Sequence, residues 1–336
     1  MSAQTSGKKN FTTRSFKEYK DAQKRIVMCT AYDCMQASIV EAAGVDVILV
    51  GDSIGITTLG YNTTLPVKMN DMKRATAAVT KGAPNSYVVT DMPFMSYQHS
   101  HKEGMQNAAT LVAQAGASAV KVEGASFETL SLIEGLVAAG IPVVGHLGLT
   151  PQSINALGGY HTQAKDSEEI VKLMMDAHSI MTAGVCAIVL ECVPAEVAEE
   201  LSEMHMLPII GIGSGPHCDG EVQVFHDLLG LSGDFKPRHA KRFIEGAELL
   251  TKALEEYVQD VRSSKFPAAA QSTNIDPKIV EEATPIFVER LIEQVEMMDG
   301  SVEIIPDDAC ELIGSDFDNP EDSGRFFSGG SRAHLN

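Results

Sequence analysis

The sequence predicts a (β/α)₈ barrel, a closed ring of eight parallel strands in which each strand is followed by a helix. Short apolar runs rich in β-branched residues alternate along the chain with longer stretches of helix-forming composition. Such repetition of strand and helix requires parallel strands joined by right-handed crossovers. An Ala-Gly pair also stands at four helix-to-strand joints, at residues 43–44, 115–116, 139–140 and 183–184, and glycine there is typical of a helix C-terminus.

The expected elements follow one another in order along the chain. Strands are expected at residues 25–31, 47–50, 86–91, 117–123, 141–146, 185–191, 207–212 and, more weakly, 222–226. Helices are expected at residues 16–24, 36–43, 70–81, 101–114, 127–139, 166–182, 196–204 and 237–263, with Asn70 or Asp71 as the cap of the third. The segments 54–66 and 148–161 have no regular pattern and are candidate lids over a site.

An open, doubly wound sheet is the alternative fold for alternating strands and helices. That fold would need a glycine-rich phosphate loop between the first strand and the first helix. Tyr32, Asp33 and Cys34 stand there instead, so the closed barrel is favoured.

The composition divides the chain into three regions. Residues 1–24 are expected to form a polar arm and a helix, and residues 25–268 the catalytic barrel. Residues 269–336 form an acidic extension without a catalytic motif. Within it, residues 275–298 could supply one amphipathic helix, and the remainder, above all 307–336, has the composition of a largely disordered segment.

The overall charge excludes several classes of partner. The 336-residue chain has a formal net charge of −19, which argues against nucleic acid or an anionic membrane surface as partner. No apolar run is long enough to span a bilayer. An anionic small substrate stays possible, because a bound metal can reverse the local field.

The cysteines point to a reducing compartment. The six of them form no CxxC pair and lie mostly in apolar segments, so buried free thiols in a cytoplasmic protein are expected. The first 17 residues contain Ser, Thr, Lys and Arg but no acid, which leaves a mitochondrial location as the lesser alternative.

Polar side chains close the carboxyl ends of five consecutive predicted strands. In a barrel these ends meet at one mouth, where active sites lie. Several of these residues have a structural explanation when taken alone, as a turn or capping aspartate, an ion-paired lysine or a hydrogen-bonded buried histidine. Glu191 is harder to explain in this way, because it ends an almost wholly apolar run. Four carboxylates that converge on one mouth, however, need a positive partner. The residues are Asp52, Ser53, Asp91, Lys121, Glu123, His146 and Glu191.

Oxygen-only ligands favour a hard cation. Asp52 and Asp91, with Glu123 bound directly or through water, suit octahedral Mg²⁺, and no His/Cys cluster with zinc spacing competes. Mg²⁺ with open positions can bind a 2-oxo acid, acidify its neighbouring C–H and stabilise the resulting enolate. Lys121 adds a positive donor to the same oxygens, and Glu191 is then the natural general base.

Seven short segments between about Phe16 and Pro267 form a recognisable pattern. They are Thr30–Asp33, Val50–Ser53, Asp91–Phe94, Lys121–Gly124, Gly145–Gln152, Leu190–Pro194 and Ile210–Gly213. In order and spacing they resemble the ketopantoate hydroxymethyltransferase family. The resemblance implies a barrel of the phosphoenolpyruvate/pyruvate-binding type. It also implies that a one-carbon unit passes from 5,10-methylenetetrahydrofolate to 3-methyl-2-oxobutanoate, which gives 2-dehydropantoate and tetrahydrofolate in pantothenate biosynthesis.

The resemblance also assigns roles to individual residues. Asp52, Asp91 and Glu123 correspond to the Mg²⁺ site, and Glu191 to the proton acceptor. The expected contacts of the oxo acid are Asp52, Ser53, Asp91, Lys121 and His146. A high-order homo-oligomer, most simply a decamer, is implied as well.

Two other functions stay open from the sequence. One is a Mg²⁺-dependent lyase or mutase of the same barrel type, which would cleave or rearrange an oxo acid. The other is a non-catalytic sensor or scaffold, although the full set of acids and Lys121 argues against it. The extension beyond about Ala268 departs from the family pattern and is expected to be dispensable for the chemistry.

Overall fold

The computed structural model describes residues 10–233 and 236–297. The chain divides into one compact unit that ends at Tyr257 and a second unit that begins at Val258. The first unit contains the whole barrel.

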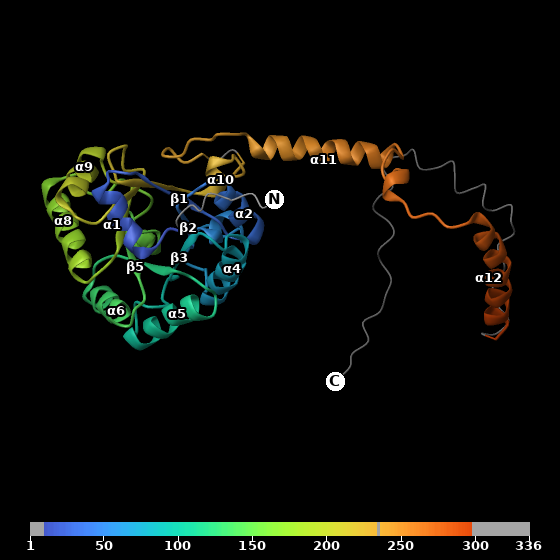
Figure 1. Cartoon of the computed structure of the whole chain (residues 1–336), viewed down its shortest axis with the longest axis horizontal. Coiled ribbons are helices and arrows are strands. Elements are labelled where there is room, and N and C mark those ends of the chain that lie inside the picture. The colour runs from blue at the N-terminus through green and yellow to red at the C-terminus, as the bar shows by residue number, and fades with distance from the viewer. Residues whose placement is uncertain (1–9, 234–235, 298–336) are drawn as a thin grey trace, which may run out of the picture. The chain divides into compact units, whose positions relative to one another are not determined.

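The first unit is a closed barrel of eight parallel strands in sequence order (Figure 1). The last strand pairs with the first, in a register that sets Ile26 beside Gly220. Closure confirms the predicted fold class and excludes the open doubly wound sheet. The strands are β1 Ile26–Thr30, β2 Val47–Val50, β3 Tyr87–Asp91, β4 Ala119–Glu123, β5 Val143–Gly148, β6 Ala187–Glu191, β7 Ile209–Ile212 and β8 Gly220–Gln223.

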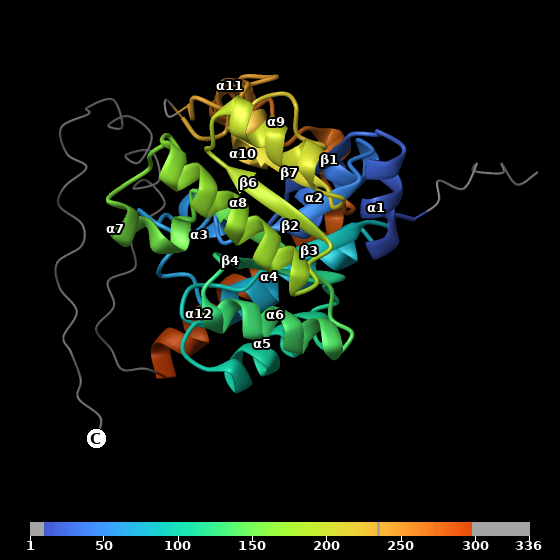
Figure 2. The same cartoon turned by 90° about the vertical axis from the view of Figure 1, so that its left-hand side faces the viewer.

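Helices surround the strands, as Figure 1 shows for α2, α4, α5, α6, α8 and α9; Figure 2 turns α8 and β6 toward the viewer. At the four Ala-Gly joints the glycines have φ between +83° and +103°, the left-handed conformation that ends a helix. The helices that match predicted ranges are α1 Thr13–Asp21, α2 Cys34–Ala42, α4 Met69–Gly82, α5 His101–Ala113, α6 Phe127–Ala138, α8 Ser167–Thr182 and α9 Ala195–Met204.

The eighth strand and the helix after it differ from the prediction. β8 lies at Gly220–Gln223 rather than 222–226, and residues 225–228 form the short helix α10 Phe225–Leu228. A β carbon at Gly220 would lie 2.5 Å from the carbonyl oxygen of Ile26, so the close pairing with β1 needs this glycine. The predicted helix at 237–263 begins only at Gly246, as α11 Gly246–Arg262, because Phe243 and Gly246 first donate backbone hydrogen bonds to Leu228 and Leu229.

The two candidate lids are more regular than predicted. Residues 54–66 contain the short helix α3 Ile54–Thr57, and residues 148–161 contain a 3₁₀ turn, η1 Pro151–Ser153, followed by α7 Ile154–Leu157. The cap of α4 also differs. Lys68 is its N-cap residue, and Asp71 accepts the Lys68 N–H from inside the first turn.

The core has two layers that follow the alternation of the strands. Val47 and Leu49 on β2 point into the barrel, whereas Ile48 and Val50 face the surrounding helices. The inner layer includes Phe16 of α1, which is 1 % exposed, so α1 closes the N-terminal end of the barrel.

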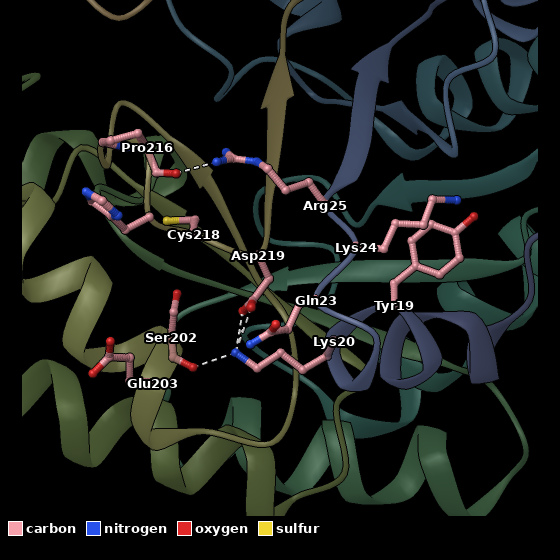
Figure 3. A pocket seen from close by; sticks show the side chains of 11 residues that line it. Tyr19, Lys20, Gln23, Lys24, Arg25, Ser202, Glu203, Pro216, Cys218 and Asp219 are labelled. Carbon is pink, nitrogen blue, oxygen red and sulfur yellow. Dashed lines mark hydrogen bonds and ion pairs between the residues drawn. The ribbon is translucent and has the colours of Figure 1, made fainter.

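A pocket of about 480 Å³ lies at this closed end, opposite the strand ends that carry the acids (Figure 3). Its cations already have protein partners. Lys20 pairs with Asp219 at 2.7 Å, Lys24 lies over the ring of Tyr19, and Arg25 donates to the carbonyl of Pro216. The pocket is therefore explained as the seam between α1 and the β7–β8 connection.

The second unit contains η2 Ala269–Gln271 and α12 Pro277–Met297, which agrees with the helix predicted at 275–298. The segment 307–336, expected to be disordered, lies outside the described residues, as does Cys310. The other cysteines are free; Cys29 and Cys218 are buried as predicted, but Cys34 is exposed. Among the described residues, none of the helices is long and apolar enough to cross a membrane.

Candidate active site

The inward register of the strands gathers the predicted polar residues at one mouth. On β3, Tyr87 and Val89 belong to the inner core, and Asp91 is the next residue on that face. The same alternation on β4, β5 and β6 carries polar residues into the mouth of the barrel at the carboxyl ends. These residues are Lys121, Glu123, His146 and Glu191.

Asp52 and Asp91 lie against each other. The backbone N–H of Asp52 donates to Oδ2 of Asp91 at 3.0 Å, and both side chains are buried. Burial raises the pKa of the Asp52 carboxyl, and the charges of Asp91 and Glu123 raise it further. Burial also raises the pKa of Asp91, although Lys121 opposes the effect. Two carboxylates from consecutive strands are thus close enough to face one cation.

Lys121 supplies positive charge to this group of acids. Its Nζ lies 3.0 Å from Oδ1 of Asp91, which is its neighbour in the β3–β4 ladder. Burial lowers the pKa of Lys121, but the charges of Asp91, Glu123 and Asp52 outweigh burial and the net shift is upward. The buried ammonium therefore stays charged at neutral pH.

His146 lies between two carboxylates. Its Nε2 is 3.3 Å from Oε2 of Glu191, and its Nδ1 is 3.3 Å from Oε1 of Glu123 and 3.0 Å from Nζ of Lys121. A neutral ring accepts from the ammonium at Nδ1, whereas a protonated ring donates to both acids. Burial and Lys121 lower the pKa of His146, but the nearby carboxylates of Glu123 and Glu191 raise it to about 9.

Glu191 faces the mouth at the end of β6. Its side chain is 16 % exposed. Glu191 is therefore accessible to a substrate in the mouth, but its side chain does not extend outward into solvent. Gly148 on β5 makes this position possible, because its φ is +83° and a β carbon there would lie 2.3 Å from the carbonyl oxygen of Glu191. The close approach of β5 and β6 fixes the backbone that carries the acid.

Ser53 lies at the start of α3, next to Asp52. Its hydroxyl is 2.8 Å from the hydroxyl of Tyr32, at the end of β1. Burial raises the pKa of Tyr32 to about 12, so this phenol stays neutral and can donate to Ser53. The role of Tyr32 was not predicted, although it lies in one of the segments that carry the family resemblance.

Two further residues of the mouth were not predicted. The amide of Gln152 donates to Oδ2 of Asp52 at 2.9 Å, and the hydroxyl of Tyr97 accepts the backbone N–H of Glu123 at 2.9 Å. Gln152 ends the segment Gly145–Gln152, which is one of those that carry the family resemblance. Its position after the fifth strand was the only sequence signal for it. Neither residue carries a charge that a search for acids and bases would notice.

The oxygen atoms of the mouth fit a hard cation. Oδ1 of Asp91 and Oε1 of Glu123 are buried and accept no hydrogen bond, although Lys121 and His146 lie at ion-pair distance. A divalent cation would satisfy such oxygens. Within the described part of the chain no group of three or more His, Cys, Asp or Glu side chains is arranged to hold a metal by itself. Mg²⁺ commonly needs only one or two protein carboxylates beside water and substrate oxygens, so the arrangement suits it.

The fold has relatives among solved structures. A phosphoenolpyruvate phosphomutase from Streptomyces platensis subsp. rosaceus matches with a TM-score of 0.54 and 14% identity over 84% of this chain and 99% of that one. A phosphonopyruvate hydrolase, solved with oxalate and Mg²⁺, matches with a TM-score of 0.52 and 12% identity over 84% of this chain and 98% of that one. At such identities the likeness concerns the fold alone, and it agrees with the closed eight-stranded barrel.

The sequence has closer relatives. A 3-methyl-2-oxobutanoate hydroxymethyltransferase of Carboxydothermus hydrogenoformans is 48% identical over 270 residues, which cover 80% of this chain and 98% of the relative. The enzyme of the same name from Geobacillus thermodenitrificans is 49% identical over 78% of this chain and 93% of the relative. The family model described as ketopantoate hydroxymethyltransferase matches residues 10–269. The chain therefore belongs to the ketopantoate hydroxymethyltransferase family.

Proposed function

We propose that this enzyme transfers a hydroxymethyl unit to 3-methyl-2-oxobutanoate. The one-carbon donor is 5,10-methylenetetrahydrofolate, water is consumed, and the products are 2-dehydropantoate and tetrahydrofolate. Family membership supports the reaction. The single observation that carries the mechanism is the position of Glu191, a carboxylate at the end of β6 whose Oε2 lies 3.3 Å from Nε2 of His146.

Asp52 and Asp91, with Glu123 directly or through water, are the residues that would hold Mg²⁺. The bound cation would polarise the 2-oxo group, which acidifies the hydrogen at C3. The buried oxygens of Asp91 and Glu123 that accept no hydrogen bond support this assignment.

The other residues of the mouth bind and orient the oxo acid. The ammonium of Lys121, held charged by its acidic neighbours, offers donors to the carboxylate and 2-oxo oxygens of the substrate. The hydroxyl of Ser53, fixed by Tyr32, offers another. His146 is proposed either to touch the substrate or to orient Glu191, and its distance to Glu191 favours the second role.

Glu191 is proposed as the proton acceptor. It takes the C3 hydrogen as a proton, and the electron pair of that C–H bond passes into the enolate. The carbon of the one-carbon unit forms a bond to C3 and a bond to the oxygen of water, while both of its C–N bonds to the folate break and the two nitrogens keep the electron pairs. The C3 proton held by Glu191 and the proton that water loses pass to these nitrogens, which gives tetrahydrofolate. Because the ammonium of Lys121 lies among the acids, it stabilises negative charge that develops on the oxo group, and a bound cation would add to this stabilisation.

We also propose a homo-oligomer, most simply a decamer. Several large apolar side chains of α11 are exposed in the single chain, among them Leu249, Leu250 and Leu254. A second copy could cover them. Native mass spectrometry of the full chain tests this, and a monomer at micromolar concentration would contradict it.

The function is tested by incubating the full chain with Mg²⁺, 3-methyl-2-oxobutanoate and 5,10-methylenetetrahydrofolate, and measuring 2-dehydropantoate. Omission of the folate must abolish product. Cleavage of an oxo acid without folate would instead support the lyase or mutase alternative. Asp52→Asn and Asp91→Asn should each weaken Mg²⁺ binding by about tenfold or more, measured by calorimetry. Asp33→Asn is the matched control, because Asp33 only caps α2.

A further inference from the structure

We propose that Gln152 is the positioning residue of the cation site. In this proposal it holds the carboxylates of Asp52 and Glu123 in the geometry that the cation needs, so the inference rests on the proposed function. Gln152 belongs to η1, in the connection after β5, whereas Asp52 follows β2 and Glu123 ends β4. A single residue thus joins acids from two distant parts of the chain.

Both the side chain and the backbone of Gln152 bind these acids. Nε2 donates to Oδ2 of Asp52 at 2.9 Å and to the carbonyl of Met92 at 2.9 Å. The backbone N–H donates to Oε2 of Glu123 at 3.0 Å. Gln152 is itself only 5 % exposed, so water does not compete for these contacts.

The surrounding contacts leave the amide one orientation. Oε1 of Gln152 lies 3.2 Å from the hydroxyl of Tyr97 and 2.9 Å from Nε2 of Gln98, which donate to it. A flipped amide would set its oxygen against the carboxylate of Asp52 and the carbonyl of Met92, two acceptors that cannot donate. The hydrogen bonds therefore aim the NH₂ group at Asp52.

A neutral donor suits this position. The amide satisfies one oxygen of Asp52 without adding a positive charge that would compete with a divalent cation. The oxygens of Asp91 and Glu123 that accept no hydrogen bond then stay available. Groups that hold metal ligands from behind typically change metal affinity by about 10- to 100-fold when they are lost. Gln152 therefore prepares the acids before the cation arrives.

The test is calorimetric titration of the full chain with Mg²⁺, together with the melting temperature without and with Mg²⁺. Gln152→Met keeps the length of the side chain but removes the donor, and we expect the Kd for Mg²⁺ to rise about 10- to 100-fold. Gln114→Met is the matched control, because Gln114 is exposed at the end of α5, where its side chain accepts from Lys73. We expect its Kd to rise less than about threefold.

A purely structural role would lower the melting temperature with and without Mg²⁺ alike and leave the Kd of the folded protein unchanged. That result for Gln152→Met would overturn the proposal. If Gln152→Met does not fold, Tyr97→Phe removes one hydrogen bond that orients the amide, and it must weaken Mg²⁺ binding in the same direction. Failure of the unmodified chain to bind Mg²⁺ would overturn the cation site itself, and this inference with it. Unchanged Mg²⁺ affinity in Gln152→Met would instead overturn only the role of Gln152.

Discussion

His146 stands directly between Glu191 and Glu123, with one ring nitrogen 3.3 Å from a carboxylate oxygen of each. The histidine therefore links the proposed proton acceptor to an acid of the proposed cation site. Both nitrogens thus lie at ion-pair distance from side chains of the protein itself. This arrangement favours an orienting role for His146 over direct contact with substrate.

The kinetic constants of His146→Asn separate these two roles. If the ring orients Glu191, kcat should fall about 10- to 100-fold while KM for the oxo acid changes little. If His146 binds substrate, KM should rise instead. His217→Asn is the control, because His217 is exposed and pairs with Glu199 at the opposite end of the barrel.

Mg²⁺ binding should release protons. The raised pKa values of Asp52 and Asp91 mean that the metal-free site holds protons at pH values where free carboxyls are ionised. Protonated carboxyls stabilise the metal-free fold below their ordinary pKa, and this contribution is lost as pH rises through the raised pKa. Because the cation needs ionised ligands, its affinity should increase with pH over the same range.

Titration calorimetry in two buffers with different ionisation enthalpies measures this release. The observed heat should differ between buffers in proportion to the protons displaced. Equal heats in both buffers, together with an affinity that does not change between about pH 5 and pH 8, would contradict the raised pKa values.

Phe16 should contribute strongly to stability. Its ring is 1 % exposed and packs edge-on against Phe11 and Tyr87, with centroid distances of 4.9 and 5.6 Å. Phe16→Ala should lower the free energy of unfolding by about 3–5 kcal/mol, because a cavity is left at the end of the barrel. Phe127→Ala, at a position 81 % exposed, should change it by less than about 0.5 kcal/mol. Urea unfolding followed by circular dichroism checks both.

The extension should be dispensable for turnover. The family model ends at residue 269, and the described residues from Val258 onward belong to a separate unit. A chain truncated after Ala270 should keep the barrel, Mg²⁺ affinity and turnover of the full chain. Loss of turnover with an unchanged circular dichroism spectrum would show that the extension takes part in the reaction.

The barrel was predictable because its signals are local. Each β-branched run is long enough for one buried strand, and each Ala-Gly joint carries the left-handed glycine that ends a helix. The predicted position of the eighth strand was wrong because the strand is positioned by its close packing against the backbone of β1. That packing leaves no room for a side chain at Gly220. The late start of α11 likewise depends on pairing with residues 228–230, which no local pattern reveals.

The convergence of the acids at one mouth was predictable for a different reason. Polar residues at the ends of buried strands are costly, so Asp91 and Glu191 stand out against apolar runs. The network that orients them could not be found in this way. Gln152 and Tyr97 are neutral, lie in connections rather than strands, and reach the acids only through the tertiary fold.

The central claim is that Glu191 removes the C3 proton of a cation-bound oxo acid, and hydrogen exchange tests it most directly. In D₂O with Mg²⁺ and no folate, the full chain should introduce deuterium at C3 of 3-methyl-2-oxobutanoate, as followed by nuclear magnetic resonance. Glu191→Gln should still bind the oxo acid, by calorimetry, but lose the exchange. If Glu191→Gln exchanges deuterium as fast as the unmodified chain, the proposed mechanism is wrong and another base removes the C3 proton.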